Sequence, residues 1–312
     1  MKKAILITVA LLILSTILYA TFRPNLILTD EWVRERTMQP DSRFISWKGN
    51  NIHYTDEGQG PVILMIHGFG GSFFNFQGIT QLLKKDFRVI RVDIPGMGLS
   101  QFHQCSEQPD FFGEYSDFFN HFLTELRLDT IHLMGNSLGG MIAWNLAVQH
   151  PEKIRSLVLL NSAGYDIESV LATAAGPLRW KWFSSLLDKG MPEIVTNHCL
   201  RHPFADKSKV NPDEYPLTYN LLNKEGTLQT LIALATSGQE PDTSLIAGIH
   251  VPTLILWGQE DLIIPVEHAA RFQRDIKNSQ VKIYSPCGHM PMMELPDSVA
   301  NDFKRFTGQL PG

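Results

Sequence analysis

The most informative segment of the chain, residues 131–140, reads Ile-His-Leu-Met-Gly-Asn-Ser-Leu-Gly-Gly. Its apolar start predicts a buried strand, and the residues from Leu138 onward have the spacing of a helix. Ser137 therefore stands on a sharp turn from strand to helix, where Gly135 and Gly139 leave room that a side chain would fill. Such a turn lifts the hydroxyl clear of the backbone and directs free helix N–H groups toward it. These features make Ser137 the candidate nucleophile.

Predicted strands and helices alternate through most of the chain. This alternation indicates a largely parallel sheet covered by helices on both faces, which is an α/β fold. Between about 164 and 248 the alternation stops, and helical spacing with frequent Pro and Gly predicts a helical insertion. The predicted strands are a hairpin over 44–57 that turns at 49–51, followed by 62–66, 87–92, 131–134, 154–160, 253–256 and 281–284, and the predicted helices include 111–127, 138–150 and 266–277.

A candidate acid and a candidate base follow the last two predicted strands. Asp261 comes just after the strand over 253–256, and His289 comes after the strand over 281–284. The carboxyl ends of parallel strands share one edge of a sheet, so we expect both side chains to lie near Ser137. His289 would take the proton of the serine hydroxyl, and Asp261 would hold the imidazole in the required tautomer.

A glycine-rich loop follows the predicted strand over 62–66. Residues 67–72 read His-Gly-Phe-Gly-Gly-Ser, which leaves backbone N–H groups free to face a substrate oxygen. We expect the N–H groups of Phe69 and Leu138 to form an oxyanion hole. Phe73 and Phe74 come next, and either line an acyl pocket or pack a helix.

These features together resemble the α/β-hydrolase superfamily. The resemblance rests on the chain order of Ser137, Asp261 and His289, on the loop that begins at His67, and on residues 93–100, which read Asp-Ile-Pro-Gly-Met-Gly-Leu-Ser. It implies a mostly parallel sheet of the eight-stranded type and a serine hydrolase that needs no metal and no organic cofactor.

The resemblance also implies a division of the chain. It covers about residues 44–308 apart from the helical insertion, which lies where the family carries a cap. We therefore expect a core over 44–164 and 246–310 and a cap over 165–245.

Within the superfamily the chain looks most like capped serine esterases and monoacylglycerol-lipase-like hydrolases, some of which carry an N-terminal membrane helix. Serine at position 137 argues against the dehalogenase and epoxide hydrolase branches, which use aspartate there. The C–C bond hydrolases share the Gly-Asn-Ser setting, but usually have a bulky aromatic residue directly after the catalytic histidine, where this chain has Met290.

The N-terminal segment, residues 1–23, predicts a membrane anchor or a signal peptide. Lys2 and Lys3 precede an uncharged run from Ala4 to Phe22, which is nearly long enough to span a bilayer. An uncleaved anchor would place the catalytic part outside the cytoplasm, and cleavage would release it as a secreted or periplasmic protein. In the insertion, Trp180 beside basic residues suggests a lipid-facing or substrate-binding position, against the alternative of ordinary helix packing.

Composition limits the partners. The 312 residues include 27 Lys and Arg against 32 Asp and Glu, a net charge of −5, which argues against nucleic acid. Three cysteines are too few for a disulfide framework.

The sequence therefore predicts hydrolysis of carboxylic esters, with short- or medium-chain acyl esters or monoacylglycerols as substrates. C–C bond hydrolysis, amide hydrolysis and perhydrolysis on the same triad are alternatives, as is a non-catalytic membrane-tethered binding protein.

Overall fold

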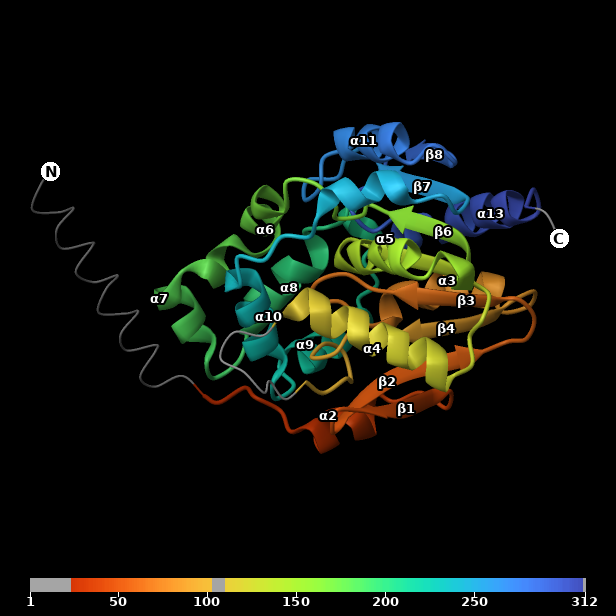
Figure 1. The fold of residues 1–312 in the computed structure, drawn as a ribbon. Helices are drawn as coiled ribbons and strands as arrows, with labels where there is room; N and C mark the ends of the chain where they lie inside the picture. Colours follow the sequence, from red (N-terminus) through yellow and green to blue (C-terminus); the bar gives the residue numbers. More distant parts are fainter. Residues whose placement is uncertain (1–23, 103–109, 311–312) are drawn as a thin grey trace, which may run out of the picture.

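An eight-stranded sheet forms the centre of the molecule, in a computed structural model that describes residues 24–102 and 110–310 (Figure 1). The spatial order of the strands is β1-β2-β4-β3-β5-β6-β7-β8. β2 runs antiparallel to both of its neighbours, and the remaining pairs are parallel. The predicted α/β fold is confirmed. The strands are β1 (Ser42–Trp47), β2 (Asn50–Glu57), β3 (Val62–Ile66), β4 (Arg88–Val92), β5 (Ile131–Asn136), β6 (Ile154–Leu160), β7 (Thr253–Gly258) and β8 (Ser279–Tyr284).

Helices cover both faces of the sheet because the central strands are apolar on both sides. In β3, Ile63 and Met65 belong to one core cluster, while Leu64 and Ile66 belong to another. The first cluster packs under α3 and α13, and the second under α4 and α5. Among the described residues, the α-helices outside the cap are α2 (Asp30–Thr37), α3 (Gln77–Leu83), α4 (Phe111–Glu125), α5 (Leu138–Gln149), α11 (Glu267–Asp275), α12 (Pro291–Glu294) and α13 (Pro296–Thr307).

The first hairpin turns earlier than the sequence predicts. Its two turn residues are Lys48 and Gly49, both with positive φ (47° and 77°), whereas the prediction placed the turn at 49–51. A two-residue turn in which both residues have positive φ twists in the same sense as the flanking strands. Asn50 is therefore the first residue of β2 and pairs with Trp47.

The chain between β6 and β7 forms helices and, within its described residues, no strand. These helices gather at one end of the molecule, over the carboxyl ends of the parallel strands (Figure 1). We call this segment the cap. Its α-helices are α6 (Ile167–Ala175), α7 (Lys181–Ser184), α8 (Glu193–Arg201), α9 (Glu214–Leu222) and α10 (Thr227–Thr236), with 3₁₀ turns η3 (Gly176–Arg179), η4 (Ser185–Leu187), η5 (Lys207–Lys209) and η6 (Thr243–Gly248).

The segment over 24–37 connects the cap to the sheet, a role that the sequence did not reveal. The Leu28 N–H donates to the Asn223 carbonyl in the cap (2.8 Å). Two residues later, the Asp30 carboxylate accepts a hydrogen bond from the amide of Gln101 (2.9 Å), which lies beyond β4. One short segment thus contacts both parts of the chain.

The prediction of a transmembrane helix is withdrawn. Residues 1–23, on which it rested, lie outside the described residues. Among the described residues, no helix is long and apolar enough to cross a membrane.

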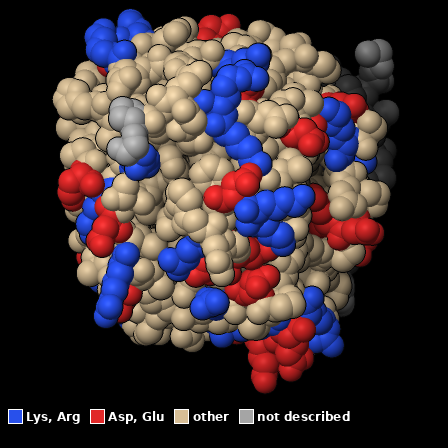
Figure 2. Space-filling view, turned by 90° about the vertical axis from the view of Figure 1, so that its right-hand side faces the viewer, with Lys and Arg blue, Asp and Glu red and all other residues tan. Residues whose placement is uncertain are grey.

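Charges of both signs are interspersed on the face opposite the cap (Figure 2). Lysine and arginine side chains alternate there with aspartate and glutamate, and neither sign dominates.

Glu214, at the start of α9, should make the stability of the folded protein depend on pH. Its half-buried carboxyl has no hydrogen-bond partner among the described residues, and burial raises its pKa from 4.5 to about 7. A raised pKa in the folded state means that stability is complete below about pH 4.5 and falls as the pH rises through 7. We expect Glu214→Gln to unfold at a higher temperature than the wild type at pH 8.5, and at the same temperature at about pH 4.

Glu193→Gln is the matched control, because Glu193 is exposed at the start of the neighbouring helix α8. Equal melting temperatures of the wild type and Glu214→Gln at both pH values would contradict the assignment.

Candidate active site

Ser137 occupies the turn between β5 and α5 in a strained backbone conformation, with φ 55° and ψ −118°. The turn is held by the N–H of Ser137, which donates to the Leu160 carbonyl, and by the N–H of Ala163, which donates to the Ser137 carbonyl (3.1 and 3.0 Å). Neighbouring backbone requires the flanking glycines: a Cβ on Gly135 would lie 2.2 Å from the Gly139 carbonyl oxygen, and one on Gly139 would lie 2.1 Å from that of Ile66. The predicted turn is therefore present, and the packing around it explains both glycines.

His289 and Asp261 form a buried hydrogen-bonded pair. The Nδ1–H of His289 donates to Asp261 Oδ2 at 2.7 Å, and both residues are more than nine-tenths buried. Burial alone would raise the pKa of Asp261, but the adjacent His289, the Asn161 amide and the Ile264 N–H outweigh it and lower the pKa. Asp261 is thus ionised at neutral pH, and its hydrogen bond places the proton of a neutral His289 ring on Nδ1, which makes Nε2 the acceptor.

The carboxylate of Asp261 is held on both of its oxygens. Oδ2 also accepts from the side-chain amide of Asn161 (2.6 Å), and Oδ1 accepts from the N–H groups of Ile263 and Ile264 (2.8 and 3.0 Å). These donors fix the orientation of the carboxylate, and hence of the imidazole that it contacts.

The backbone of His289 is tied to the turn that carries Ser137. The amide of Asn136 donates to the His289 carbonyl at 3.1 Å. Among the described residues, neither the Ser137 hydroxyl nor Nε2 of His289 has a hydrogen-bond partner. Both groups are thus available to each other and to a ligand, and such contacts commonly tighten only when substrate is bound.

The glycine-rich loop lies directly against Ser137. A Cβ on Gly68 would lie 3.0 Å from the Ser137 Cβ. The N–H groups of Phe69 and Leu138 have no acceptor within the part of the chain that the structure describes. Two unpaired backbone donors next to a serine hydroxyl suit a developing oxyanion.

Two buried groups hold this loop. His67 accepts the Ile94 N–H at Nε2 (3.0 Å) and donates from Nδ1 to the Gly68 carbonyl (2.8 Å), while burial lowers its pKa and keeps the ring neutral. Asp93 accepts from the N–H of Phe73 at 2.7 Å and from the ring of His53 at 2.8 Å.

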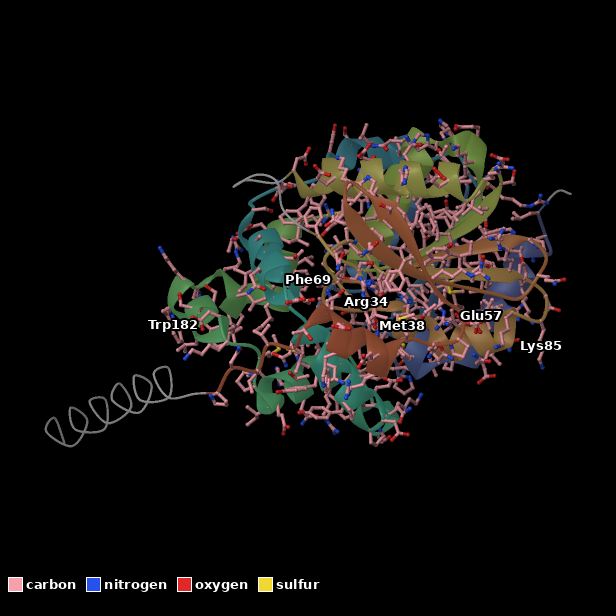
Figure 3. All side chains as sticks on the ribbon, turned by 90° about the horizontal axis from the view of Figure 1, so that it is seen from below. Arg34, Met38, Glu57, Phe69, Lys85 and Trp182 are labelled. Atoms are coloured by element: carbon pink, nitrogen blue, oxygen red, sulfur yellow. The ribbon has the colours of Figure 1, made fainter. Side chains whose placement is uncertain are left out.

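The three aromatic residues that the sequence suggested for substrate binding differ in their burial. Phe73 is completely buried and packs between His53 and Phe74, with ring centroids 4.6 and 4.1 Å apart, so its assignment to an acyl pocket is wrong. Phe74 is only partly buried. Trp180 is 56% exposed on the cap and stacks on Trp182, which lies at the outer end of the cap, away from Phe69 (Figure 3).

The cap covers the loops around Ser137. Side-chain carbons of Leu222 and Leu231 lie 3.8 and 3.9 Å from the position of a Cβ on Gly70, next to the free N–H of Phe69. On the other side, the carbonyl of Pro203 accepts the N–H of His289 (2.7 Å). The cap therefore contacts both the glycine-rich loop and the histidine loop.

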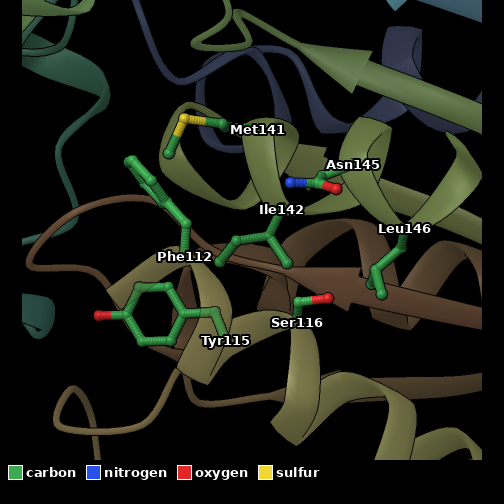
Figure 4. Close-up of a pocket in the computed structure, with 7 residues that line it drawn as sticks. All are labelled: Phe112, Tyr115, Ser116, Met141, Ile142, Asn145 and Leu146. Atoms are coloured by element: carbon green, nitrogen blue, oxygen red, sulfur yellow. The ribbon is translucent and has the colours of Figure 1, made fainter. Parts of the chain in front are cut away.

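Two cavities lie away from Ser137. A cleft of about 570 Å³ lies where the cap leaves and rejoins the core, and is lined by Tyr165, Asp166 and Arg271 among others. A second, of about 10 Å³, lies between α4 and α5 (Figure 4) and is lined mainly by apolar side chains such as Ile142 and Leu146. Neither is lined by the serine, so the candidate site lies in neither.

Asn161, Asn136 and Glu294 contribute to the site and were missed from the sequence. Asn161 follows β6 directly, so its place at the carboxyl end of a strand could have indicated it. No comparable local signal marked Glu294, which is 3% exposed on α12 and accepts the N–H of Gly288 at 2.7 Å.

Gly139→Ala should destabilise the protein, because the new methyl group would collide with the backbone of Ile66, which cannot move as a flexible side chain does. We expect a loss of about 2 kcal/mol or more, measured by urea unfolding. Gly248→Ala is the control, since a Cβ there meets nothing within 4 Å and the change should stay within about 0.5 kcal/mol. An equally small loss at Gly139 would refute the packing account of the turn.

The chain is similar to known hydrolases along most of its length. Lipase 1 of Psychrobacter immobilis is 29% identical over 267 residues, which cover 83% of this chain and 81% of the lipase. The 2-hydroxy-6-oxo-6-(2'-aminophenyl)hexa-2,4-dienoic acid hydrolase of Metapseudomonas resinovorans is 28% identical over 276 residues, 83% of this chain and 88% of that enzyme. The crystal structure of a membrane phospholipase A, described as a bacterial virulence factor, superposes with a TM-score of 0.73 at 25% identity and covers 99% of this chain and 98% of its own.

The model of the α/β hydrolase fold family matches residues 61–296. That range contains the turn at Ser137, the glycine-rich loop, the cap and the pair of Asp261 and His289. The chain belongs to the α/β hydrolase family.

Proposed function

We propose that this hydrolase cleaves carboxylic esters of short- or medium-chain acids, or monoacylglycerols, through an acyl-enzyme on Ser137. The observation that carries the proposal is the buried 2.7 Å hydrogen bond between His289 and Asp261, beside a serine held on a strained turn. A binding protein has no use for a serine, a base and an acid oriented in this way.

The first step forms the acyl-enzyme. Nε2 of His289 takes the hydroxyl proton as Ser137 Oγ attacks the ester carbonyl carbon, and the carbonyl oxygen becomes an oxyanion. The N–H groups of Phe69 and Leu138 would bind that oxyanion. Each such donor typically contributes about 3–4 kcal/mol in the transition state. His289 then returns the proton to the leaving alcohol as the carbon–oxygen bond breaks.

The second step releases the acid. His289 takes a proton from water, the resulting hydroxide attacks the acyl carbon, and the proton passes to Oγ of Ser137 as the ester to the enzyme breaks. Asp261 stays ionised throughout and stabilises the imidazolium in both steps. No metal or organic cofactor is needed for this sequence.

The apolar cap supports a neutral acyl substrate. Leu222 and Leu231 approach the glycine-rich loop near the proposed oxyanion hole. Apolar side chains there favour an acyl chain over a charged group. The name of the related lipase points to the same class of substrate.

C–C bond hydrolysis is the second candidate. A relative of equal similarity carries the name of a dienoic acid hydrolase, and the same triad and oxyanion hole serve both chemistries. Met290 after the histidine, in place of the bulky aromatic residue usual in that group, favours the ester.

Hydrolysis of p-nitrophenyl butyrate tests the proposal. We expect the full-length wild type to turn over this ester, and Ser137→Ala to lose activity by several orders of magnitude, because the nucleophile is gone while the oxyanion hole remains. A series of p-nitrophenyl esters from acetate to palmitate would then define the acyl chain.

If Ser137→Ala retained activity, the assignment of Ser137 as the nucleophile would be wrong. Activity on a 2-hydroxy-6-oxo-dienoate combined with none on any ester of the series would replace the ester proposal with the second candidate.

A further inference from the structure

We infer that Glu294 is a positioning residue, which holds the loop of His289 and fastens the cap to it. The inference rests on the proposed role of His289 as the base. It assigns a function to a buried carboxylate that takes no direct part in the proposed chemistry.

Glu294 joins two segments that are far apart in the chain. Its Oε1 accepts the N–H of Gly288 at 2.7 Å, directly before His289. Its Oε2 accepts the N–H groups of Ala205 and Asp206 in the cap, at 3.0 and 3.2 Å. The side chain is only 3% exposed, so all three hydrogen bonds lie in a poorly solvated environment, where they are strong.

Other contacts reinforce the same junction. The N–H of His289 donates to the Pro203 carbonyl at 2.7 Å, so two successive N–H groups of the histidine loop are engaged there. The ammonium of Lys209 donates to the main-chain carbonyl of Glu294 at 2.9 Å. A Cβ on Gly288 would lie 2.4 Å from the Pro203 oxygen, which shows how closely the two segments approach.

The chemistry of the junction requires a carboxylate. Three N–H donors converge on the two oxygens, and both oxygens must accept. A glutamine has one oxygen and an NH₂ group that would face a donor, so it can satisfy the histidine side or the cap side but not both. The two segments would then separate or shift at one of them.

The consequence for catalysis follows from the position of His289. A base displaced by about 1 Å from its productive position costs up to about 100-fold in rate. Loss of the junction should therefore lower kcat. Binding of a small ester depends on the pocket rather than on the base, so KM should change little.

Glu294→Gln in the full chain tests the inference with two probes. The first is hydrolysis of p-nitrophenyl butyrate, for which we expect kcat to fall at least 10-fold while KM stays within threefold. The second is the rate of labelling by a fluorophosphonate, in which a Ser137 Oγ–phosphorus bond replaces phosphorus–fluoride as the serine proton passes to His289. We expect that rate to fall by a similar factor.

Glu260→Gln is the matched control. The Glu260 carboxylate accepts the N–H of Cys287 at 2.8 Å on the same loop, but it is exposed and contacts no cap residue through a hydrogen bond in the described chain. It should leave kcat and the labelling rate within threefold. Melting temperatures of both variants show whether the fold is retained.

An unchanged kcat and labelling rate in Glu294→Gln, with a change in melting temperature or KM alone, would assign Glu294 a structural role and overturn the inference. If the wild type is labelled but does not cleave the ester, only the proposed substrate class is refuted. The labelling rates would then still show whether Glu294 positions His289. A wild type that is neither labelled nor active on the ester would overturn both proposals.

If Glu294→Gln does not fold, Ala205→Pro removes one of the cap donors. Its kcat should then fall with little change in KM, and an unchanged kcat would overturn the inference.

Discussion

The buried carboxylate of Asp261 is the interaction on which the rest of the site depends. A carboxylate in this position is stable only if donors replace the water it has lost, and four are present: the ring of His289, the amide of Asn161 and two backbone N–H groups. They lower its pKa against the effect of burial. The neutral histidine is thereby fixed in the tautomer with its proton on Nδ1, and Nε2 has no protein partner in the described chain.

Buried carboxylates that accept backbone N–H groups also hold two other loops at this edge of the sheet. Asp93 binds the N–H of Phe73 and secures the glycine-rich loop, and Glu294 binds the N–H of Gly288 and secures the histidine loop. Each of the three carboxylates is buried, and each satisfies backbone donors that the loop itself leaves unpaired. In each loop these polar contacts act together with apolar packing, such as that of Cys287 in the core beside the histidine loop.

The sequence predicted the central strands well because their signals are local. The runs at 62–66 and 154–160 coincide with β3 and β6, and the glycines on either side of Ser137 marked the turn that the structure contains. The sequence did not predict the order of the strands in the sheet, which the structure supplies.

What the sequence missed depends on contacts between distant residues. Glu294 meets Ala205 across 89 positions of the chain, and Asn161 meets Asp261 across 100. The spacing of apolar residues along the sequence does not indicate such pairs. The sequence left Phe73 open between a pocket and helix packing, because an aromatic ring suits either, and its complete burial beside His53, 20 positions away, is a contact between distant residues.

We propose that Asp261 and His289 together activate Ser137. The rate of fluorophosphonate labelling can be measured for the wild type and for Asp261→Asn, with the modified peptide identified by mass spectrometry. We expect the label on Ser137 alone. We also expect Asp261→Asn, which keeps the shape of the side chain but loses the tautomer, to react about 10⁴-fold more slowly. Labelling at another residue, or an equal rate in the two proteins, would contradict it.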